Sequence, residues 1–300
     1  MHVEPDDDGQ RLDRWLKKKF PHIAFGQMQK IIRTGQIRID GKRAKGDARL
    51  SAGQELRLPP MLANAEVAEK TIDAKDKALI QSLIVYDDED IVVINKPAGL
   101  AVQGGPNITR HVDGMLDGLT GANGVRPRLV HRLDKDTSGL LLLARSAESA
   151  RRLSTAFAGR DVEKIYVAIC APAPEDDAGR IDAPLAKGMA GPDLEKMMTD
   201  DEVGKSAITD YKVLARGRDA GLVQFMPLTG RTHQIRVHAA EIGAPLWGDA
   251  KYGGTGKGRF YLHAKKLTII HPKTGKDMTL EAPVSAEFAT KCQALSIAFK

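Results

Sequence analysis

The residues best placed to do chemistry lie in one short stretch, HRLDKDTSGLLLLAR, at positions 131–145. It sets a dense mixture of opposite charges directly before a run of four leucines. Asp134 stands next to Leu133 and close to that run, so we expect its carboxylate to be partly desolvated. Desolvation disfavours the charged form of a carboxylic acid unless a cation or hydrogen bonds offset it. An arginine partner would keep Asp134 ionised and oriented, as a nucleophile or a general base requires.

A second polar stretch, TGRTHQIRVH at positions 229–238, is rich in cations. The order Gln-Ile-Arg-Val-His alternates polar and apolar residues, which is typical of a strand with Ile235 and Val237 pointing inward. Three polar side chains then share the other face: Gln234, Arg236 and His238. Because the stretch itself contains no acidic residue, this face needs an anion, either a substrate phosphate or a carboxylate from elsewhere in the fold.

Other interpretations of these residues stay open. A metal-dependent nuclease would draw its ligands from three residues of the first stretch: His131, Asp134 and Asp136. For His233 and His238, a spacing of five puts the rings on opposite faces of a strand and not on one face of a helix. No cysteine pair accompanies them, and we expect no metal site. A structural ion pair between Arg132 or Arg236 and one aspartate would also explain the charges.

The composition is that of a folded, water-soluble protein. The chain has 300 residues, of which 42% are apolar and 28% charged. It contains no apolar run of the roughly 18 residues that a membrane-spanning helix requires. The first ten residues, MHVEPDDDGQ, are acidic and lack the apolar segment of a secretory signal. Cys170 and Cys292 stand far apart in apolar surroundings and are expected to be buried free thiols, which fits a cytoplasmic enzyme.

The positive charge is concentrated near the N-terminus. Residues 10–60 contain 13 Lys and Arg against 4 Asp and Glu, whereas the whole chain has a net charge of only +6. Such a block is typical of a surface that binds phosphate backbones. Helical spacing predicts one helix in RLDRWLKKKF and a second in QMQKIIRTGQ that ends at Gly35, followed by a hairpin turning at Asp40-Gly41.

We therefore divide the chain into four parts. Residues 1–10 form an acidic tail, 11–60 a small nucleic-acid-binding module, 61–82 a linker with some helix, and 83–300 a catalytic domain. The last part is expected to be a strand-rich α+β domain with a few helices. Its strand VEKIYVAICA places Lys164 and Tyr166 on one face. The following stretch, which is rich in Pro, Gly and acidic residues, predicts no element.

Two regions resemble known families. The module, through RLDRWL, IIRTGQIRIDGK and AGQELRLP, resembles the RNA-binding module of ribosomal small-subunit protein four. Four further segments resemble the RluA-type RNA pseudouridine synthases: VINKPAGLAVQGG, HRLDKDTSGLLLLAR, VEKIYVAI and LTGRTHQIRVHAAEIGAPLWGDAKYGG. Together these segments cover nearly the whole chain in the order that the family has. They are most similar to the RluC kind, which acts on large-subunit ribosomal RNA.

The resemblance implies that the protein isomerises uridine to pseudouridine in RNA, with the base detached from its ribose, rotated and rejoined through carbon. No group is added and no redox step occurs, so no cofactor is implied. By their places in the family motifs, Asp134 is the catalytic carboxylate and Arg236 is the arginine that pairs with it. Arg132 enters the RNA stack in place of the target base, and Tyr166 packs on that base. Whether the aspartate attacks the ribose or the base, or assists elimination, stays open.

The resemblance also implies the fold and the partners. The expected fold is α+β, with a small α/β RNA-binding module followed by a mixed, largely antiparallel β-sheet domain with flanking helices. RNA contacts are expected from six basic residues: Lys30, Arg33, Arg38, Lys42, Arg43 and Arg231. We expect ribosomal RNA as the partner, a monomeric enzyme, and neither a membrane nor a metal. A non-catalytic RNA-binding ribosome-assembly factor on the same fold is the alternative function.

Overall fold

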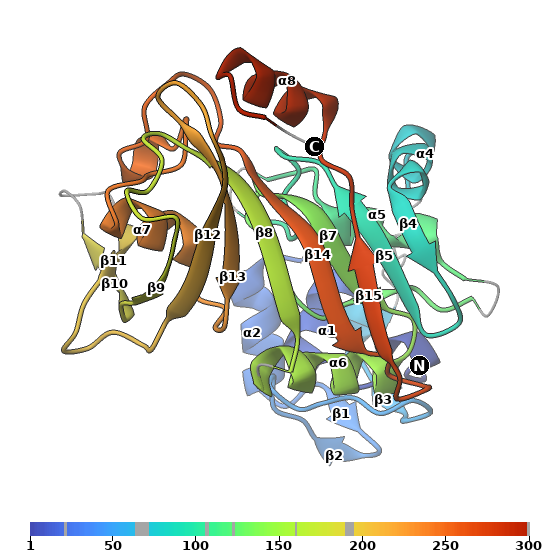
Figure 1. Cartoon of the computed structure of the whole chain (residues 1–300). Helices are drawn as coiled ribbons and strands as arrows, with labels where there is room; N and C mark the ends of the chain where they lie inside the picture. Colours follow the sequence, from blue (N-terminus) through green and yellow to red (C-terminus); the bar gives the residue numbers. More distant parts are fainter. Residues whose placement is uncertain are drawn as a thin grey trace. The chain divides into compact units, whose positions relative to one another are not determined.

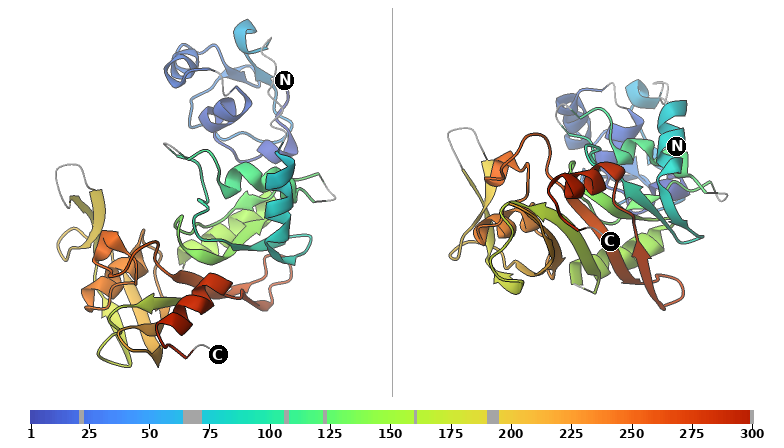
Figure 2. Two further views of the ribbon diagram at one scale, coloured as in Figure 1. Left: turned by 90° about the horizontal axis from the view of Figure 1, so that it is seen from above. Right: turned by 45° about the horizontal axis from the view of Figure 1, so that its top comes forward.

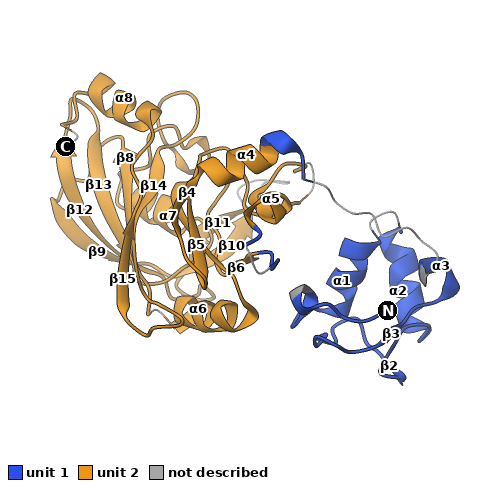
Figure 3. Cartoon of the chain, turned by 90° about the vertical axis from the view of Figure 1, so that its right-hand side faces the viewer, with its two compact units in different colours: residues 1–75, 120–126 blue, residues 76–119, 127–300 orange. Residues whose placement is uncertain are grey.

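The computed structural model describes residues 1–20, 23–63, 72–105, 108–121, 124–159, 161–189 and 195–298. This part of the chain forms two compact units, residues 1–75 with 120–126 and residues 76–119 with 127–300, which Figure 3 colours separately. Each unit has a hydrophobic core of its own. No helix within the described ranges is long and apolar enough to cross a membrane.

The first unit, blue in Figure 1, is a helix pair with a small sheet. Its elements are η1 (Pro5–Asp7), α1 (Leu12–Lys19), α2 (Phe25–Arg33), β1 (Arg38–Ile39), β2 (Lys42–Arg43), β3 (Leu56–Arg57) and α3 (Pro60–Ala63). Trp15, Leu16 and Ile31 are buried in its core. The sheet order is β2-β1-β3, and Asp40 and Gly41 turn the first hairpin with φ angles of 47° and 77°. The predicted helix pair and hairpin are confirmed.

The first ten residues belong to this unit, so the prediction of a separate acidic tail is wrong. The Val3 backbone N–H donates to the Gln54 carbonyl at 2.9 Å, and the Val3 side chain is part of the core. The Asp7 carboxylate accepts a hydrogen bond from the Trp15 indole at 2.7 Å and lies 3.1 Å from the Lys18 ammonium. One indole and two cations, those of Lys18 and Lys19, therefore hold the Asp7 carboxylate in a run whose composition alone suggested solvation.

The second unit is built on one ten-stranded sheet (Figure 1). Its strands are β4 (Ile84–Asp87), β5 (Ile91–Lys96), β6 (Arg128–Leu129), β7 (Ser138–Ala144), β8 (Glu163–Cys170), β9 (Ala178–Asp182), β12 (Ile208–Arg216), β13 (Gly221–Pro227), β14 (Leu262–Ile270) and β15 (Asp277–Glu281). The order is β4-β5-β7-β14-β8-β13-β12-β9, with β15 beside β14 and β6 beside β7. Only the β14–β7 pair is parallel among these described strands. The expected mixed, largely antiparallel sheet is confirmed.

Helices and one separate hairpin surround this sheet. The helices are α4 (Ala74–Ser82), α5 (Val112–Met115), η2 (Leu116–Leu119), α6 (Ala147–Gly159), α7 (Gln234–Glu241), η3 (Ala250–Tyr252) and α8 (Ala286–Ala294). The hairpin of β10 (Leu185–Met189) and β11 (Glu195–Thr199) lies beside α7 (Figure 2), where the Thr199 hydroxyl donates to Glu241 at 3.1 Å. The hairpin and β9 fall in the stretch for which the sequence predicted no element. Ser146 caps α6 as expected, since its Oγ accepts the Ser149 N–H at 3.0 Å.

The end of the predicted linker is a helix of the second unit. Residues 76–82 form most of α4, in which Ile80 is buried and the Gln81 side chain donates to the Gly118 carbonyl at 3.1 Å. The stretch 64–71, also assigned to the linker, lies outside the described residues. Only one residue of α4 is buried, so its weak apolar pattern gave little sign that the helix packs on the domain.

The stretch Gln234–Glu241 is the helix α7, so the prediction of a strand there is wrong. The alternation suggested one apolar face, yet every residue from Gln234 to Ala239 is buried. A helix that is buried all round has no solvent-facing stripe and therefore shows no helical periodicity in its sequence. The three polar side chains are buried but do not form one face that needs an anion, because Arg236 bonds the Asp249 carboxylate whereas Gln234 and His238 bond the Thr209 hydroxyl.

The leucine run that follows the charged stretch lies in β7, an interior strand of the sheet between β5 and β14. Leu140 to Leu143 lie in β7 and are fully buried. Gly139 begins the run with a φ of 106°, and a Cβ at this position would lie 2.3 Å from the Ala264 carbonyl oxygen of β14. Glycine is therefore required where the charged loop enters the sheet, because two strands approach each other there without room for a side chain.

Candidate active site and RNA-binding surface

Asp134 lies in the loop that joins β6 to β7, and the loop is tied to the protein through its backbone. The Asp134 carbonyl accepts the Thr137 N–H at 3.2 Å, which closes a turn. The Lys135 carbonyl accepts the Gly99 N–H at 2.9 Å and the Lys96 ammonium at 3.0 Å. With Thr137 itself buried, these bonds fix the backbone from which the half-exposed Asp134 carboxylate projects.

Lys96, the last residue of β5, is a fully buried cation in this support. It donates to three backbone carbonyls: Pro97 O at 3.0 Å, Leu100 O at 2.8 Å and Lys135 O at 3.0 Å. Burial lowers the pKa of Lys96 to about 7, while the charges of Asp136 and Asp134 act in the opposite direction. Sequence reasoning quoted this residue in the NKPAG motif but gave it no role. A lysine at the end of a wholly buried strand was the signal.

His131 does not join Asp134 as a reactive group. Its Nε2 accepts the Leu142 N–H of β7 at 2.9 Å, and its ring stacks on Phe157 of α6 with centroids 4.3 Å apart. Burial lowers the pKa of His131 to about 3, so the ring is neutral. The nuclease set of His131, Asp134 and Asp136 is therefore not assembled, because the imidazole belongs to the packing between β7 and α6.

Arg236 reaches the site from α7, but its main partner is Asp249 and not Asp134. Its Nε and Nη2 donate to the two Asp249 oxygens at 2.7 and 2.8 Å. Its Nη1 lies 3.9 Å from Asp134 Oδ2. The guanidinium also lies against the rings of Tyr252 and Phe260, 4.8 and 4.4 Å from their centroids. Although burial opposes it, the hydrogen bonds to Asp249 raise the pKa of Arg236.

Arg236 therefore forms the expected ion pair with Asp134 and a shorter, bidentate one with Asp249, so that one buried aspartate orients the cation for the other carboxylate. Asp249 was missed because it lies after α7 in an apolar stretch, APLWGD, where nothing marks it as a partner. An arginine held at two nitrogens by a buried carboxylate has a fixed geometry. The remaining nitrogen is then presented to Asp134.

His233, immediately before α7, is the second side chain, after Arg236, with a nitrogen within 4 Å of the Asp134 carboxylate. Its Nε2 lies 3.8 Å from Asp134 Oδ2 and its Nδ1 lies 2.7 Å from the Tyr252 hydroxyl. His238 has a different place, with Nδ1 2.9 Å from Thr209 Oγ1 and Nε2 3.0 Å from the Ala183 carbonyl. The two histidines therefore do not share a site, as their spacing predicted.

The side chains of Asp134, His233 and Arg236 line a cavity of about 180 Å³. Its walls include four groups that the sequence singled out: Arg132, Lys164, Tyr166 and Arg231. Lys164 and Tyr166 both reach the cavity from β8, as their alternation predicted. Burial, and secondarily the charge of Asp134, raises the pKa of Tyr166, so its phenol keeps its proton near neutral pH. Arg231 is anchored at the rim by its Nε, which donates to the Ser206 carbonyl at 3.1 Å.

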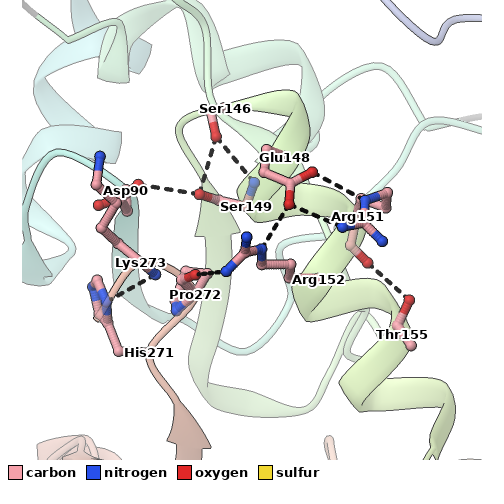
Figure 4. Close-up of polar contacts among 10 residues, drawn as sticks. All are labelled: Asp90, Ser146, Glu148, Ser149, Arg151, Arg152, Thr155, His271, Pro272 and Lys273. Atoms are coloured by element: carbon pink, nitrogen blue, oxygen red, sulfur yellow. Dashed lines mark hydrogen bonds and ion pairs between the residues drawn. The ribbon is translucent and has the colours of Figure 1, made fainter. Parts of the chain in front are cut away.

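A second cluster of polar side chains, Asp88, Asp90 and His271, has the spacing of a metal site but is committed to hydrogen bonds. His271 Nδ1 accepts two backbone N–H groups, one of them from Lys273 (Figure 4), so its Nε2–H donates to Asp88 at 3.0 Å. Asp90 accepts the Ser149 hydroxyl of α6 at 3.3 Å (Figure 4). The cluster therefore joins the β4–β5 turn to α6 and to the β14–β15 turn.

The first unit carries a row of three arginines across its small sheet. Arg38 of β1 stands opposite Arg43 of β2 on one side and Arg57 of β3 on the other, and all three are exposed. Like charges directly opposite each other destabilise a sheet. Arg43 also donates to the Arg33 carbonyl at the end of α2. Arg57 was missed by the sequence reasoning, since only the strand pairing places it in this row.

The remaining predicted contacts of this unit, Lys30 and Arg33 of α2 and Lys42 of β2, have exposed side chains. Lys42 lies on β2 beside Arg43 of the row, and Lys30 and Arg33 lie on α2, the element directly before β1. A repulsive row of cations with further exposed cations close by is typical of a surface that binds a polyanion.

Comparisons with known proteins agree with this geometry. The family model for RNA pseudouridylate synthase matches residues 90–241, and the model for the S4 domain matches residues 10–56. "Ribosomal large subunit pseudouridine synthase C" of Escherichia coli K12 is 35% identical over 299 residues, covering 94% of this chain and 92% of its own. The protein of that name from Vibrio vulnificus is 33% identical and covers 98% of this chain and 96% of its own.

A solved structure is also similar. "Human RNA Pseudouridylate Synthase Domain Containing 4" superimposes with a TM-score of 0.65 at 27% identity, covering 75% of this chain and 98% of that chain. The expected fold and the expected family are confirmed by these matches. The chain belongs to the family of RNA pseudouridine synthases and carries an S4 domain at its N-terminal end.

Proposed function

We propose that this protein converts uridine to pseudouridine in large-subunit ribosomal RNA. In this isomerisation the bond from N1 of the base to C1′ of the ribose breaks and a bond from C5 to C1′ forms. C5 loses a proton and N1 gains one, so nothing is added or oxidised and no cofactor is needed. The observation that carries the proposal is the placing of Asp134 in a cavity, within 4 Å of both Arg236 and His233. The printed names of the relatives from Escherichia coli and Vibrio vulnificus support the ribosomal substrate.

Asp134 is the group that reacts with the uridine, and Arg236 orients it. An oriented guanidinium close to a carboxylate favours its charged form. Tyr166 packs on the uracil ring, since its phenol stays protonated and offers an aromatic face in the cavity. Stacking of a base on an aromatic side chain contributes roughly 1–3 kcal/mol.

The target nucleotide must leave its helix to reach Asp134, because the carboxylate lies inside a cavity and not on a protruding surface. Flipping a nucleotide costs about a few kcal/mol in lost stacking and pairing. Arg132 is exposed at the cavity and takes the place of the flipped base in the stack. Arg231, whose Nε donates to the Ser206 carbonyl, binds the displaced phosphate backbone.

The first unit binds the RNA outside the reacting nucleotide. Its contacts are Lys30, Arg33, Arg38, Lys42 and Arg43, to which the strand pairing adds Arg57. Phosphates placed along the arginine row would remove the repulsion among these side chains, so the row favours the bound state.

We place the enzyme in the cytoplasm as a monomer acting in ribosome biogenesis. Two buried free cysteines suit a reducing compartment.

The test is the Asp134→Asn variant of the full-length protein. We expect it to form no pseudouridine in ribosomal RNA while binding that RNA as tightly as the wild type. Asp136→Asn is the matched control, since it makes the same substitution two residues away, and it should remain active. Mapping of pseudouridines in ribosomal RNA from cells with and without the gene identifies the modified positions. Turnover by Asp134→Asn, or an Asp134→Ala chain that fully replaces the wild type in ribosome assembly, would refute the catalytic function.

A further inference from the structure

His233 has a backbone conformation that side-chain-bearing residues seldom adopt. Its φ and ψ are 56° and 17°, in the left-handed region, directly before the first turn of α7. Its carbonyl accepts the Val237 N–H at 3.0 Å and so begins the helix. Such strain persists only where surrounding contacts over-determine it, and it gathers at functional sites. The contacts of the imidazole therefore need a reason beyond helix capping, for which the side chain is not used.

The two ring nitrogens of His233 face two different groups. Nδ1 lies 2.7 Å from the Tyr252 hydroxyl, whose ring meets the imidazole edge-on at 78°. Nε2 lies 3.8 Å from Asp134 Oδ2. The second distance exceeds that of a hydrogen bond, but catalytic hydrogen bonds are often long before the substrate is bound. The imidazole thus links a phenol on one side to the reacting carboxylate on the other.

The hydrogen bond between the Tyr252 hydroxyl and His233 Nδ1 couples the tautomer of the imidazole to the direction in which the hydroxyl donates. The Tyr252 oxygen accepts the Met197 backbone N–H of β11 at 3.3 Å. Its own proton is then available to Nδ1 of the imidazole, which leaves the ring proton on Nε2. The opposite tautomer would aim the lone pair of Nε2 at the ionised Asp134. Burial lowers the pKa of His233 and raises that of Tyr252, so both groups are neutral near pH 7 and the tautomer matters.

Tyr252 also contacts Arg236, the other neighbour of Asp134. Its ring lies against the Arg236 guanidinium, whose Nε and Nη2 are already occupied by Asp249. Only Nη1 of Arg236 faces Asp134. The carboxylate therefore has two donors at nearly the same distance, of which one is bonded to the Tyr252 hydroxyl and the other lies against the Tyr252 ring.

We propose that His233 is a positioning residue for the isomerisation. Tyr252 holds its ring as the Nε2–H tautomer, and this N–H, together with Arg236, keeps the Asp134 carboxylate ionised and oriented toward the cavity. Hydrogen bonds run from the Met197 N–H through Tyr252 to His233, whose Nε2 faces Asp134 at 3.8 Å. This inference rests on the proposed role of Asp134 as the reacting group.

Other charged and titratable groups face the same carboxylate and contribute to its pH dependence. Around His233 these are Asp134, Arg236, Asp249, Lys251 and Tyr252. Around Asp134 they are Lys96, Arg132, Lys164, Tyr166 and Arg231. Substitution at His233 or Tyr252 leaves the second set in place, so a change in the pH profile can be assigned to the chain described above.

The test combines three variants of the full-length protein. His233→Asn removes the Nε2 donor, and asparagine tolerates the left-handed backbone. His233→Gln restores an N–H near the Nε2 position. Tyr252→Phe keeps the ring against Arg236 but removes the hydroxyl. We expect His233→Asn and Tyr252→Phe to have a kcat about 10- to 100-fold lower at little changed KM, as for the loss of a hydrogen bond to a charged group. In a plot of kcat against pH, the acidic limb of these two variants should move to higher pH. His233→Gln should recover part of the rate.

His271→Asn is the matched control. It removes a buried histidine that also bonds an aspartate, Asp88. Neither of these two residues lines the cavity. It should lower the melting temperature and leave the acidic limb in place. If His233→Asn and Tyr252→Phe keep the wild-type kcat and acidic limb and change only the melting temperature, the proposal is overturned.

Nuclear magnetic resonance of the ¹⁵N-labelled histidine rings gives a readout that does not depend on turnover. The chain has eight histidines, and the resonances missing from His233→Asn assign those of His233. We expect a protonated Nε2 and a bare Nδ1 in the wild type, and loss of this preference in Tyr252→Phe. A protonated Nδ1 in the wild type would overturn the inference even if the enzyme is active. A wild type that makes no pseudouridine would instead refute the proposed function.

Discussion

Replacement of Lys96 by methionine tests how the loop bearing Asp134 is held. Methionine has a similar length but no N–H, whereas the neutral Lys96 amine at pH 9 keeps two N–H donors for the three carbonyls that it faces. The Lys135 carbonyl keeps the Gly99 N–H, which leaves two carbonyls, those of Pro97 and Leu100, to carry most of the loss. A buried polar group without its partner costs about 1–3 kcal/mol. We therefore expect Lys96→Met to lower the free energy of unfolding by about 3 kcal/mol at pH 9.

The pH dependence of this loss follows from the direction of the Lys96 shift. Burial lowers the pKa of Lys96 from 10.5 to about 7 in the folded protein. Between these values the unfolded chain binds more protons than the folded one, so the stability of the wild type rises with pH across this window. Below pH 7 both states are protonated and the whole cost of the buried charge is present. The slope approaches about 1.4 kcal/mol per pH unit, and the two proteins should be nearly equal in stability at pH 6.

Urea unfolding followed by tryptophan fluorescence measures the difference. The chain has two tryptophans, and a Trp15→Phe background leaves Trp247 as a reporter of the second unit. Lys135→Met, an exposed neighbour, is the control and should change stability by less than about 0.5 kcal/mol. A difference between Lys96→Met and wild type that does not grow from pH 6 to pH 9 would refute the reasoning. It would mean that the three carbonyls keep the ammonium charged throughout.

The other predictions concern the sheet, the buried ion pair and the basic surface. Gly139→Ala should destabilise the second unit by about 3 kcal/mol or more in the same urea assay, because its Cβ would lie 2.3 Å from a backbone oxygen of β14; unchanged stability would contradict the close approach. Asp249→Asn should lower the free energy of unfolding by about 3 kcal/mol and reduce kcat, since it leaves Arg236 buried without its carboxylate; calorimetry and turnover measure the two effects, and a stable, fully active variant would count against the pair. Lys42→Gln should reduce the slope of log affinity against log salt by about 0.7–0.9 for one lost phosphate contact, at unchanged stability. Arg43→Gln should reduce it similarly but also destabilise the first unit, because Arg43 bonds the end of α2; equal melting temperatures for these two variants would contradict this difference.

The sequence motifs determined the family and the RNA-binding module, and they singled out Asp134 as the candidate reacting carboxylate. Alternation along β8 placed Lys164 and Tyr166 on one face, and both line the cavity. Helical spacing and the Asp40-Gly41 turn defined the helix pair and the hairpin of the first unit. These features are local, because each depends on backbone periodicity or turn chemistry within a few residues.

The partners of the reacting group were decided only by the tertiary structure. Arg236 was expected to pair with Asp134, yet its bidentate partner is Asp249, and the segment that carries it is a helix rather than a strand. His131 looked reactive in the sequence but is packed between two elements. Lys96 looked incidental but holds the catalytic loop. In each case the contact joins segments that are distant in the chain, and a buried helix or a buried cation leaves no periodic pattern from which its partner can be deduced.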